Sequence, residues 1–362
     1  MLIKESLEKL CLAPAPSGYE KLCAYAWKEL MAPYADECRI DRNGNVICTV
    51  EGTDRSAPSV MVFAHLDTLG FIVRRVENDG FIQVDRLGGI PEKVLPGLHL
   101  SLRTTDGRFI PGVFGNKAHH ATSADEKYKV DVVTSLFVDI GASSREEVEQ
   151  RGVDVGCPVI YEPHFGMLSE DRACATALDN RGGLVAMLKA AQLLHEKRPR
   201  STVHFVGTVW EEFNIRGAVF AARSLRPDVA LCLDVILAGD THDLEHRYEN
   251  RVGGGPTVNY YSFHGRGTLN GTLPHEGLTL LAHRAAREDG IPVQRFASLG
   301  IITDSAYVQM EGEGIACLDL GFPARYTHTP VEVCSLKDIE NLGRLVAAIT
   351  GRLDADFPLS RY

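Results

Sequence analysis

The strongest constraint on the fold comes from three largely apolar runs, each only as long as one strand: 60–64, 203–206 and 229–233. Strands without polar alternation are typical of central strands that are covered on both faces. Helical patterns at 181–197 and 217–224 separate these runs along the chain. Because strands that alternate with helices indicate a sheet with helices on its faces, we predict an α/β fold.

The middle of the chain has a different sequence pattern. Its short β-like runs include 80–84, 98–102 and 135–140, and its predicted helix is 145–150. Short strands with glycine and proline between them indicate a separate β-rich unit. A chain of 362 residues is long enough for two folding units. We therefore predict an α/β domain made of 1–69 and 164–362, interrupted by a β-rich insertion at 70–163.

Local patterns predict the remaining elements. The segment from Ser17 to Glu20 fits a capping box ahead of a helix at 22–31. A turn around Gly44 fits a hairpin. The other predicted elements are hairpin strands at 38–40 and 46–50, helices at 278–287 and 336–353, and a strand at 314–320.

Charge and cysteine content disfavour several classes of protein. Lys and Arg number 38 against 48 Asp and Glu, and the formal net charge of -10 disfavours binding to nucleic acid or to an anionic membrane. The N-terminal segment lacks the uninterrupted apolar stretch of a signal peptide, so we predict a cytoplasmic protein. The nine cysteines form no CxxC pair and indicate neither a disulfide framework nor a cysteine zinc site. Any metal would be held by His, Asp and Glu.

His65 and Asp67 follow the apolar run 60–64, at the strand end where open α/β sheets bind ligands. Because a strand has a period of two, both side chains point to the same side. A carboxylate often holds the second nitrogen of a metal-binding imidazole, which makes His65 a candidate ligand and Asp67 its candidate partner. An HxD pair alone is common by chance and carries little weight.

Other ionisable residues converge with His65. They are Glu211, Glu212 and Asp234 at predicted strand ends, and Asp179 and His328 in adjoining loops. Taken singly, a loop aspartate usually caps a helix, and a loop histidine is usually exposed. Together, two imidazoles and three carboxylates suit a pair of divalent ions about 3.5–4 Å apart with one carboxylate between them. Adjacent glutamates diverge at a strand end, so one can bind metal while the other moves protons.

Seven segments, in this order, resemble those of one known family. They are PSGYE, HLDTLGFIV, LFVDIGASSREEVEQRGVDVGCPV, ALDNRGG, EEFNIRGA, DVILAGDT and RYTHTPVE. Together they cover essentially the whole chain, which resembles the M42 group of co-catalytic metallo-aminopeptidases of the glutamyl, deblocking and tetrahedral types. The resemblance implies a mixed-sheet α/β peptidase domain with an inserted β-barrel-like dimerisation domain. It also implies a homo-oligomer, with a dimer as building block and a dodecamer as one possible assembly.

The resemblance also implies a role for each candidate residue. The implied ligands are His65 and Asp234 for one metal ion, Glu212 and His328 for the other, and Asp179 as the bridge. Glu211 would be the general base and acid, and Asp67 would orient His65. Zinc or cobalt is implied first, with manganese as a further option. The chain departs from common family residues at Thr68, Trp210 and Asn214-Ile215, which leaves the substrate preference open.

The leading hypothesis is an aminopeptidase that removes N-terminal residues from peptides through water activated by two metals, with a glutamate as general base. A glycoside hydrolase is one alternative, but its two carboxylates flank a sugar roughly 5–9.5 Å apart, which adjacent glutamates suit poorly. A non-catalytic assembly protein that kept the fold is the other alternative.

Three features stay open at this point. The acids and histidines of Asp240–His246 are interpreted as a polar loop rather than a further metal site. The pair His119-His120 either reaches a neighbouring subunit or is simply exposed. The preference for the substrate's first residue depends on loops such as 253–256 and 300–304, whose geometry the sequence does not give.

Overall fold

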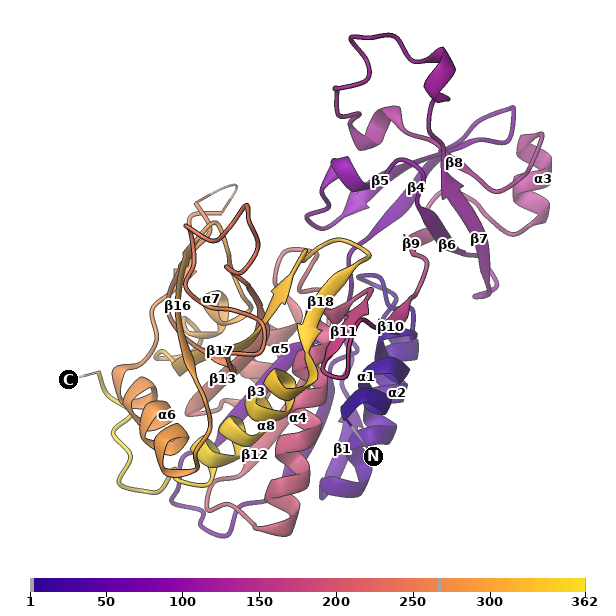
Figure 1. The fold of residues 1–362 in the computed structure, drawn as a ribbon. Coiled ribbons are helices and arrows are strands. Elements are labelled where there is room, and N and C mark those ends of the chain that lie inside the picture. The colour runs from indigo at the N-terminus through magenta and orange to yellow at the C-terminus, as the bar shows by residue number, and fades with distance from the viewer. Residues whose placement is uncertain (1–2, 266–267, 362) are drawn as a thin grey trace.

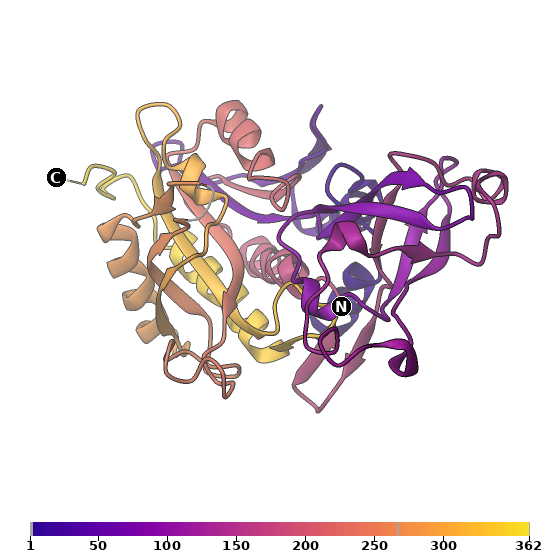
Figure 2. The ribbon, with the colours of Figure 1, turned by 90° about the horizontal axis from the view of Figure 1, so that it is seen from above.

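The computed structural model describes residues 3–265 and 268–361. Figure 1 shows two bodies, a large sheet with helices on both faces and a smaller barrel. The view from above in Figure 2 shows the barrel beside the sheet domain rather than stacked on it. This arrangement confirms the predicted fold class, an α/β domain with a mixed sheet that carries a β-barrel.

Within the described residues, the large sheet has 12 strands. They are β1 (Glu37–Ile40), β2 (Val46–Val50), β3 (Val60–His65), β10 (Phe165–Met167), β11 (Arg172–Ala175), β12 (Val203–Thr208), β13 (Val229–Leu237), β14 (Thr257–Phe263), β15 (Gly271–Thr272), β16 (Gln294–Leu299), β17 (Ala316–Arg325) and β18 (Glu332–Ser335). Nine of them lie in the order β1-β2-β12-β3-β13-β17-β18-β11-β10, and β14 joins β15 and β16 to β17. The central strands β12, β3, β13 and β17 are parallel, so their carboxyl ends meet at one edge.

Helices cover both faces of this sheet. They are α1 (Ile3–Cys11), α2 (Lys21–Met31), α4 (Leu178–Glu196), α5 (Gly217–Leu225), α6 (Glu276–Glu288), α7 (Ser305–Val308) and α8 (Leu336–Thr350), and the short 3₁₀ turn η1 (Ala32–Tyr34) follows α2. One core contains the apolar sides of α1, α2, α4, α6 and α8, and a second core lies under α5 and α7. On β12, Phe205 belongs to the first core and Val206 to the second, as the period of a strand requires.

The barrel closes in the strand order β4-β5-β8-β7-β6-β9. Its elements are β4 (Gly70–Val76), β5 (Ile82–Leu87), η2 (Glu92–Val94), β6 (His99–Arg103), β7 (Phe109–Phe114), η3 (His119–Ala121), η4 (Val133–Ser135), β8 (Val138–Asp139), α3 (Arg145–Gln150) and β9 (Pro158–Tyr161). It has its own apolar core, in which Phe71 and Phe114 meet edge to face with ring centroids 5.1 Å apart. The strand predicted at 135–140 is reduced to the two residues of β8.

Two local predictions were wrong. Ser17 does not form a capping box, because its hydroxyl donates to Asp67 and the N-cap residue Glu20 makes no side-chain cap bond. A disulfide joins Cys38 and Cys48, which lie opposite each other on β1 and β2, whereas the spacing of the cysteines indicated no bridge. The seven other cysteines are free, and all but Cys174 are buried. Among the described residues, no helix has both the length and the apolar character that a bilayer crossing needs.

Candidate functional site

The structure brings all seven predicted site residues to the carboxyl edge of the central strands. His65 is the last residue of β3 and pairs in register with Thr208 of β12. The other members are Asp67, Asp179 at the start of α4, Glu211 and Glu212 in the turn after β12, Asp234 within β13, and His328 in the loop between β17 and β18. Asp234 was predicted to end its strand, but β13 continues to Leu237 because it stays paired with β17.

Asp179 lies between the two imidazoles. Its Oδ1 is 2.9 Å from Nε2 of His65, and its Oδ2 is 3.5 Å from Nε2 of His328. The same Nε2 of His65 lies 3.9 Å from Oδ1 of Asp234 and 4.0 Å from Oε2 of Glu211. Two imidazole nitrogens therefore face one shared carboxylate, with further carboxylates around them.

Three overlapping groups of side chains have the spacing of a metal site. They are His65, Asp179 and Asp234; Asp179, Glu212 and His328; and His65, Glu211 and Glu212, each with its candidate ligand atoms within 4.8 Å of one another. The first two groups share Asp179. Oε1 of Glu212 is buried and has no hydrogen-bond partner among the described residues. An unpartnered buried oxygen beside oxygen and nitrogen donors fits a divalent cation.

The two imidazoles are oriented by backbone carbonyls. Nδ1 of His65 lies 3.0 Å from the carbonyl oxygen of Asp67, and Nδ1 of His328 lies 2.6 Å from that of Gly89. Because a carbonyl only accepts, each Nδ1 carries a hydrogen, and Nε2 is the nitrogen of each ring that a cation would bind once its proton is released. Gly89 belongs to the loop after β5, so the barrel contributes directly to the orientation of a predicted ligand.

The carboxylate of Asp67 holds the turn that carries both glutamates. It accepts the backbone amides of Glu211 and Glu212, each at 3.0 Å, and the hydroxyl of Ser17 at 2.6 Å. Its Oδ1 comes no closer than 3.7 Å to Nδ1 of His65. The contact of this residue with the imidazole is thus made by its backbone, while its side chain fixes the glutamate turn.

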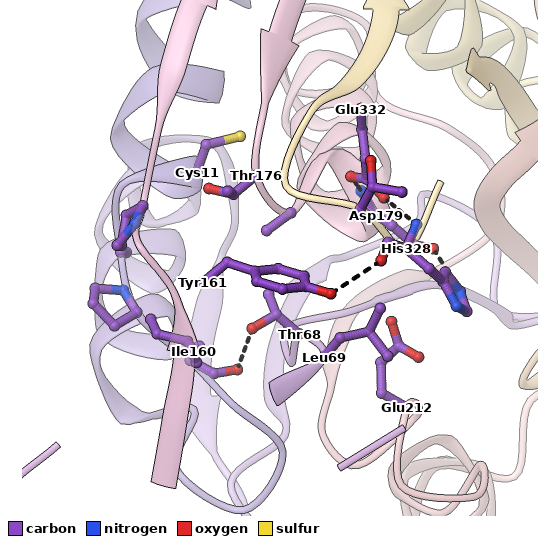
Figure 3. Close-up of a pocket in the computed structure, with 16 residues that line it drawn as sticks. Cys11, Thr68, Leu69, Ile160, Tyr161, Thr176, Asp179, Glu212, His328 and Glu332 are labelled. Atoms are coloured by element: carbon purple, nitrogen blue, oxygen red, sulfur yellow. Dashed lines mark hydrogen bonds and ion pairs between the residues drawn. The ribbon is translucent and has the colours of Figure 1, made fainter. Parts of the chain in front are cut away.

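Glu332 is a buried carboxylate at this site to which the sequence analysis gave no role. Its Oε2 accepts the backbone amide of Asp179 at 3.0 Å, and its Oε1 accepts that of His328 at 2.8 Å. The sequence signal that could have found it is an acid between apolar residues, with Val331 before it and Val333 and Cys334 after it. Figure 3 shows Asp179, His328 and Glu332 together, with the ring of Tyr161 from the barrel pointing toward them.

The cluster concentrates negative charge. Among the described residues, the ion pairs of its carboxylates come from imidazoles and not from Lys or Arg. The fully buried Arg181 donates instead to the backbone carbonyls of Leu10, Ala13 and Leu66. A cluster with this excess of carboxylates needs protons or cations to balance its charge.

Burial and mutual repulsion change the pKa values of the acids in the cluster. Burial raises the pKa of Glu212 to about 7, although His328 opposes the shift. Burial, together with the neighbouring Asp179, raises the pKa of Glu332 to about 8 and that of Asp234 well above its usual range. Asp179 behaves in the opposite way, because hydrogen bonds from both imidazoles outweigh its burial and lower its pKa.

A cleft of about 630 Å³ opens onto the cluster. This size suits a small ligand or the end of a peptide. Besides the cluster, its lining includes the barrel loop 88–91, the turn residues Asn214 and Ile215, and the loop 300–302. The residues of 253–256 do not line this cleft, so of the two loops considered for substrate preference only the second lies there.

The two other segments rich in histidine or acid that the sequence singled out do not join the metal-ligand groups of the described residues. Asp240 is paired with the guanidinium of Arg325 at 2.7 Å, and no residue of Asp240–His246 joins a candidate metal group in the described chain. His119 and His120 are exposed on η3, with their rings 5.5 Å apart.

The sequence profile of the M42 glutamyl aminopeptidases matches residues 44–345. The chain belongs to the M42 peptidase family. Its sequence is 37% identical, over 99% of this chain and 95% of the relative, to SgcX of Escherichia coli (strain K12), which is provisionally named an aminopeptidase. It is 33% identical to the lysyl aminopeptidase of Pyrococcus furiosus, with 96% of this chain and 97% of that protein covered.

Solved structures of aminopeptidases share the fold of this M42 chain. Aminopeptidase APDkam598 from the archaeon Desulfurococcus kamchatkensis superposes with a TM-score of 0.92 at 33% identity, covering 98% of this chain and 96% of that one. The TET1 peptidase of Pyrococcus horikoshii, which can assemble into a tetrahedron or a large octahedral shell, superposes with a TM-score of 0.84 at 26% identity, covering 97% and 100%. Membership of the M42 family supports a peptide hydrolase.

Proposed function

We propose that this M42 chain is a metal-dependent aminopeptidase that binds two divalent ions at the carboxyl edge of its sheet. The observation that carries the proposal is the pair of ligand groups that share one carboxylate. In this assignment His65 and Asp234 hold one ion, Glu212 and His328 hold the other, and Asp179 bridges them. The unpartnered buried oxygen of Glu212 supports the assignment, because without a cation it has nothing to offset its lost hydration.

The nitrogen and oxygen donors suit zinc or cobalt, with manganese as a further option. Divalent ions bound there would lower the pKa of a water molecule and polarise the scissile carbonyl of a peptide. The protein supplies the orientation of the ligands through the backbone acceptors of Asp67 and Gly89, which keep each Nε2 turned inward. The cleft positions the peptide end against them.

Glu211 is the proposed general base and acid. Its carboxylate reaches the cluster at His65 but is absent from both groups that share Asp179. Burial raises its pKa well above the usual range, with repulsion from Asp234 adding to the shift, as a group that accepts and returns a proton near neutral pH requires. It would take a proton from water and pass it to the leaving amine. Asp67 is proposed to assist by holding the backbone of Glu211 in place.

The two alternative hypotheses, a glycoside hydrolase and a non-catalytic assembly protein, account for fewer of the residues at this site. A glycoside hydrolase would leave His65 and His328 without a role, although both imidazoles are fixed with one nitrogen facing the same carboxylate. A non-catalytic assembly protein would have no use for a buried, proton-binding Glu211 in a cleft. Peptide cleavage that depends on a divalent metal separates the three hypotheses.

The division of the chain and its assembly are also proposals. We assign 1–69 and 164–362 to the catalytic domain and 70–163 to a dimerisation domain. The closed barrel formed between β4 and β9 supports this division. We propose a homo-oligomer with a dimer as building block and a dodecamer as one assembly open to it, and the tetrahedron or large octahedral shell that TET1 of Pyrococcus horikoshii forms supports a homo-oligomer. A cytoplasmic location stays a prediction.

The direct test is hydrolysis of a panel of aminoacyl-p-nitroanilides by protein stripped with a chelator and then resupplied with zinc, cobalt or manganese. We expect cleavage that is absent in the stripped protein and returns with metal. Cleavage of a cellulose oligomer that survives complete chelation would favour the glycosidase. A protein that binds metal but cleaves nothing would favour the non-catalytic hypothesis.

A further inference from the structure

Glu332 holds two of the proposed ligands without being placed to bind a cation itself. It is the first residue of β18 and only 2% exposed. Both of its oxygens face backbone amides, at 2.8 Å for His328 and 3.0 Å for Asp179. The three metal-ligand groups of the described residues do not include it.

The two amides belong to distant parts of the chain. Asp179 is separated from Glu332 by 153 positions and lies where β11 gives way to α4, whereas His328 lies four positions before Glu332. A single carboxylate therefore fixes the distance between two backbones whose side chains meet at Oδ2 of Asp179 and Nε2 of His328 (Figure 3). Such a contact sets the geometry of the pair before any cation enters.

The backbone of His328 adopts a conformation that has to be stabilised by its surroundings. Its φ of 66° lies in the left-handed region, which residues with a side chain seldom adopt unless their surroundings hold them there. The hydrogen bond from its Nδ1 to Gly89 orients the ring, and the bond from its amide to Glu332 holds the backbone.

We propose that Glu332 is a positioning residue that fixes the backbones of Asp179 and His328 and thereby sets the affinity of the cation site that these two share with Glu212. The inference rests on the proposed function only in taking this trio as a cation site. Groups that orient metal ligands through hydrogen bonds typically change metal affinity about 10–100-fold when they are altered.

The test is the variant Glu332→Gln, examined by cobalt(II) titration of the full-length protein. Glutamine has nearly the same shape, but its amide nitrogen would face a backbone amide and remove one of the two hydrogen bonds. We expect cobalt affinity at one of the two sites to fall about 10–100-fold. The visible absorption spectrum of the bound cobalt should also change, because the ligand geometry changes.

A matched control is available in Asp338. This buried carboxylate on α8 also accepts two backbone amides, those of Gly253 at 2.6 Å and Gly255 at 2.8 Å, in a loop that does not line the cleft. Asp338→Asn should lower the melting temperature as a structural change does, while cobalt affinity and spectrum stay native. The pair separates positioning of ligands from general stabilisation of the fold.

The inference is overturned if Glu332→Gln melts lower but binds cobalt with native affinity and a native spectrum, as the control should. If that variant does not fold, Glu332→Asp keeps the charge with a shorter reach, and native cobalt affinity in it would equally contradict the inference. Cobalt binding is measured without a substrate. Failure to cleave any peptide would therefore count against the proposed aminopeptidase and not against the role of Glu332.

Discussion

The barrel and the acidic cluster adjoin in sequence but bury opposite kinds of side chain. β3 ends at His65 and β4 begins at Gly70, yet the interior of the barrel is apolar, with Phe71 at its centre. Shifted barrel acids such as Asp106 and Glu126 are exposed and hydrogen-bonded, which lowers the pKa of each to about 2. In the cluster, by contrast, burial raises the pKa values of Glu212, Asp234 and Glu332. The barrel closes around an apolar core of its own, whereas the cluster needs protons or cations to balance its charge.

The largest expected effect separates chemistry from binding within the cluster. In Glu211→Gln we expect kcat to fall about 100–10,000-fold, because a proton acceptor is lost, while zinc content stays native. Steady-state hydrolysis of the best p-nitroanilide and metal analysis of the same sample measure the two quantities. A variant that keeps near-normal turnover would show that Glu211 is not the base.

A change in the core of the barrel should lower the stability of the protein and leave its metal binding unchanged. Phe71→Ala removes a fully buried ring that also packs edge to face on Tyr161, and we expect it to cost about 3–5 kcal/mol of unfolding free energy. Urea unfolding measures this loss, and cobalt titration below the transition should give a native affinity. A large loss of metal affinity in the folded variant would mean that the core of the barrel, and not only its loop at Gly89, positions the cluster.

Removal of the metal should lower the local stability of the cluster and leave that of the barrel strands unchanged. At free zinc about 100 times the dissociation constant, binding at one site stabilises the folded state by about 2.7 kcal/mol. Hydrogen exchange with and without zinc should show slower exchange around the turn that contains Glu211 and Glu212, and in the loop that contains His328. Equal slowing in β6 and β7 would argue against a local effect.

The smallest expected effect is the pH dependence of the metal-free protein. Raised pKa values of about 7 for Glu212 and about 8 for Glu332 mean that the folded chain keeps protons that the unfolded chain releases above about pH 4.5. The unfolded state thus binds fewer protons, and stability should fall as pH rises from 5 to 8. The lowered pKa values in the barrel act below about pH 4.5, with the opposite sign. Melting temperatures that stay flat or rise from pH 5 to 8 would contradict this reading.

Sequence patterns sufficed where a residue's position follows from its own strand or motif. The apolar run before His65 placed that residue at the end of a central strand. The loops next to the predicted strand ends brought Asp179 and His328 into the same set, and the family resemblance supplied their roles as ligands. The extent of β13 beyond Asp234 could not be predicted in this way, because Val235 to Leu237 remain in the strand through pairing with β17. The bridge between Cys38 and Cys48 follows from hairpin register rather than from a spacing motif.

The contacts that Glu332, Gly89 and Ser17 make at the site could not be predicted from the sequence, for a different reason. Glu332 meets Asp179 only because β18 pairs with β11 and β17, and Gly89 meets His328 only because the barrel is placed against the sheet domain. The capping-box pattern at Ser17 was misread because a tertiary partner, Asp67, competes for the hydroxyl. Such contacts depend on the packing of segments far apart in sequence, which no local pattern contains.

The central claim is that two ions share Asp179, and the zinc content of the purified protein tests it most directly. Protein equilibrated with a fixed excess of zinc and then freed of unbound metal should contain two zinc ions per chain. His328→Ala should retain one ion, and Asp179→Ala should retain close to none. One ion per native chain, or two in Asp179→Ala, would contradict the account.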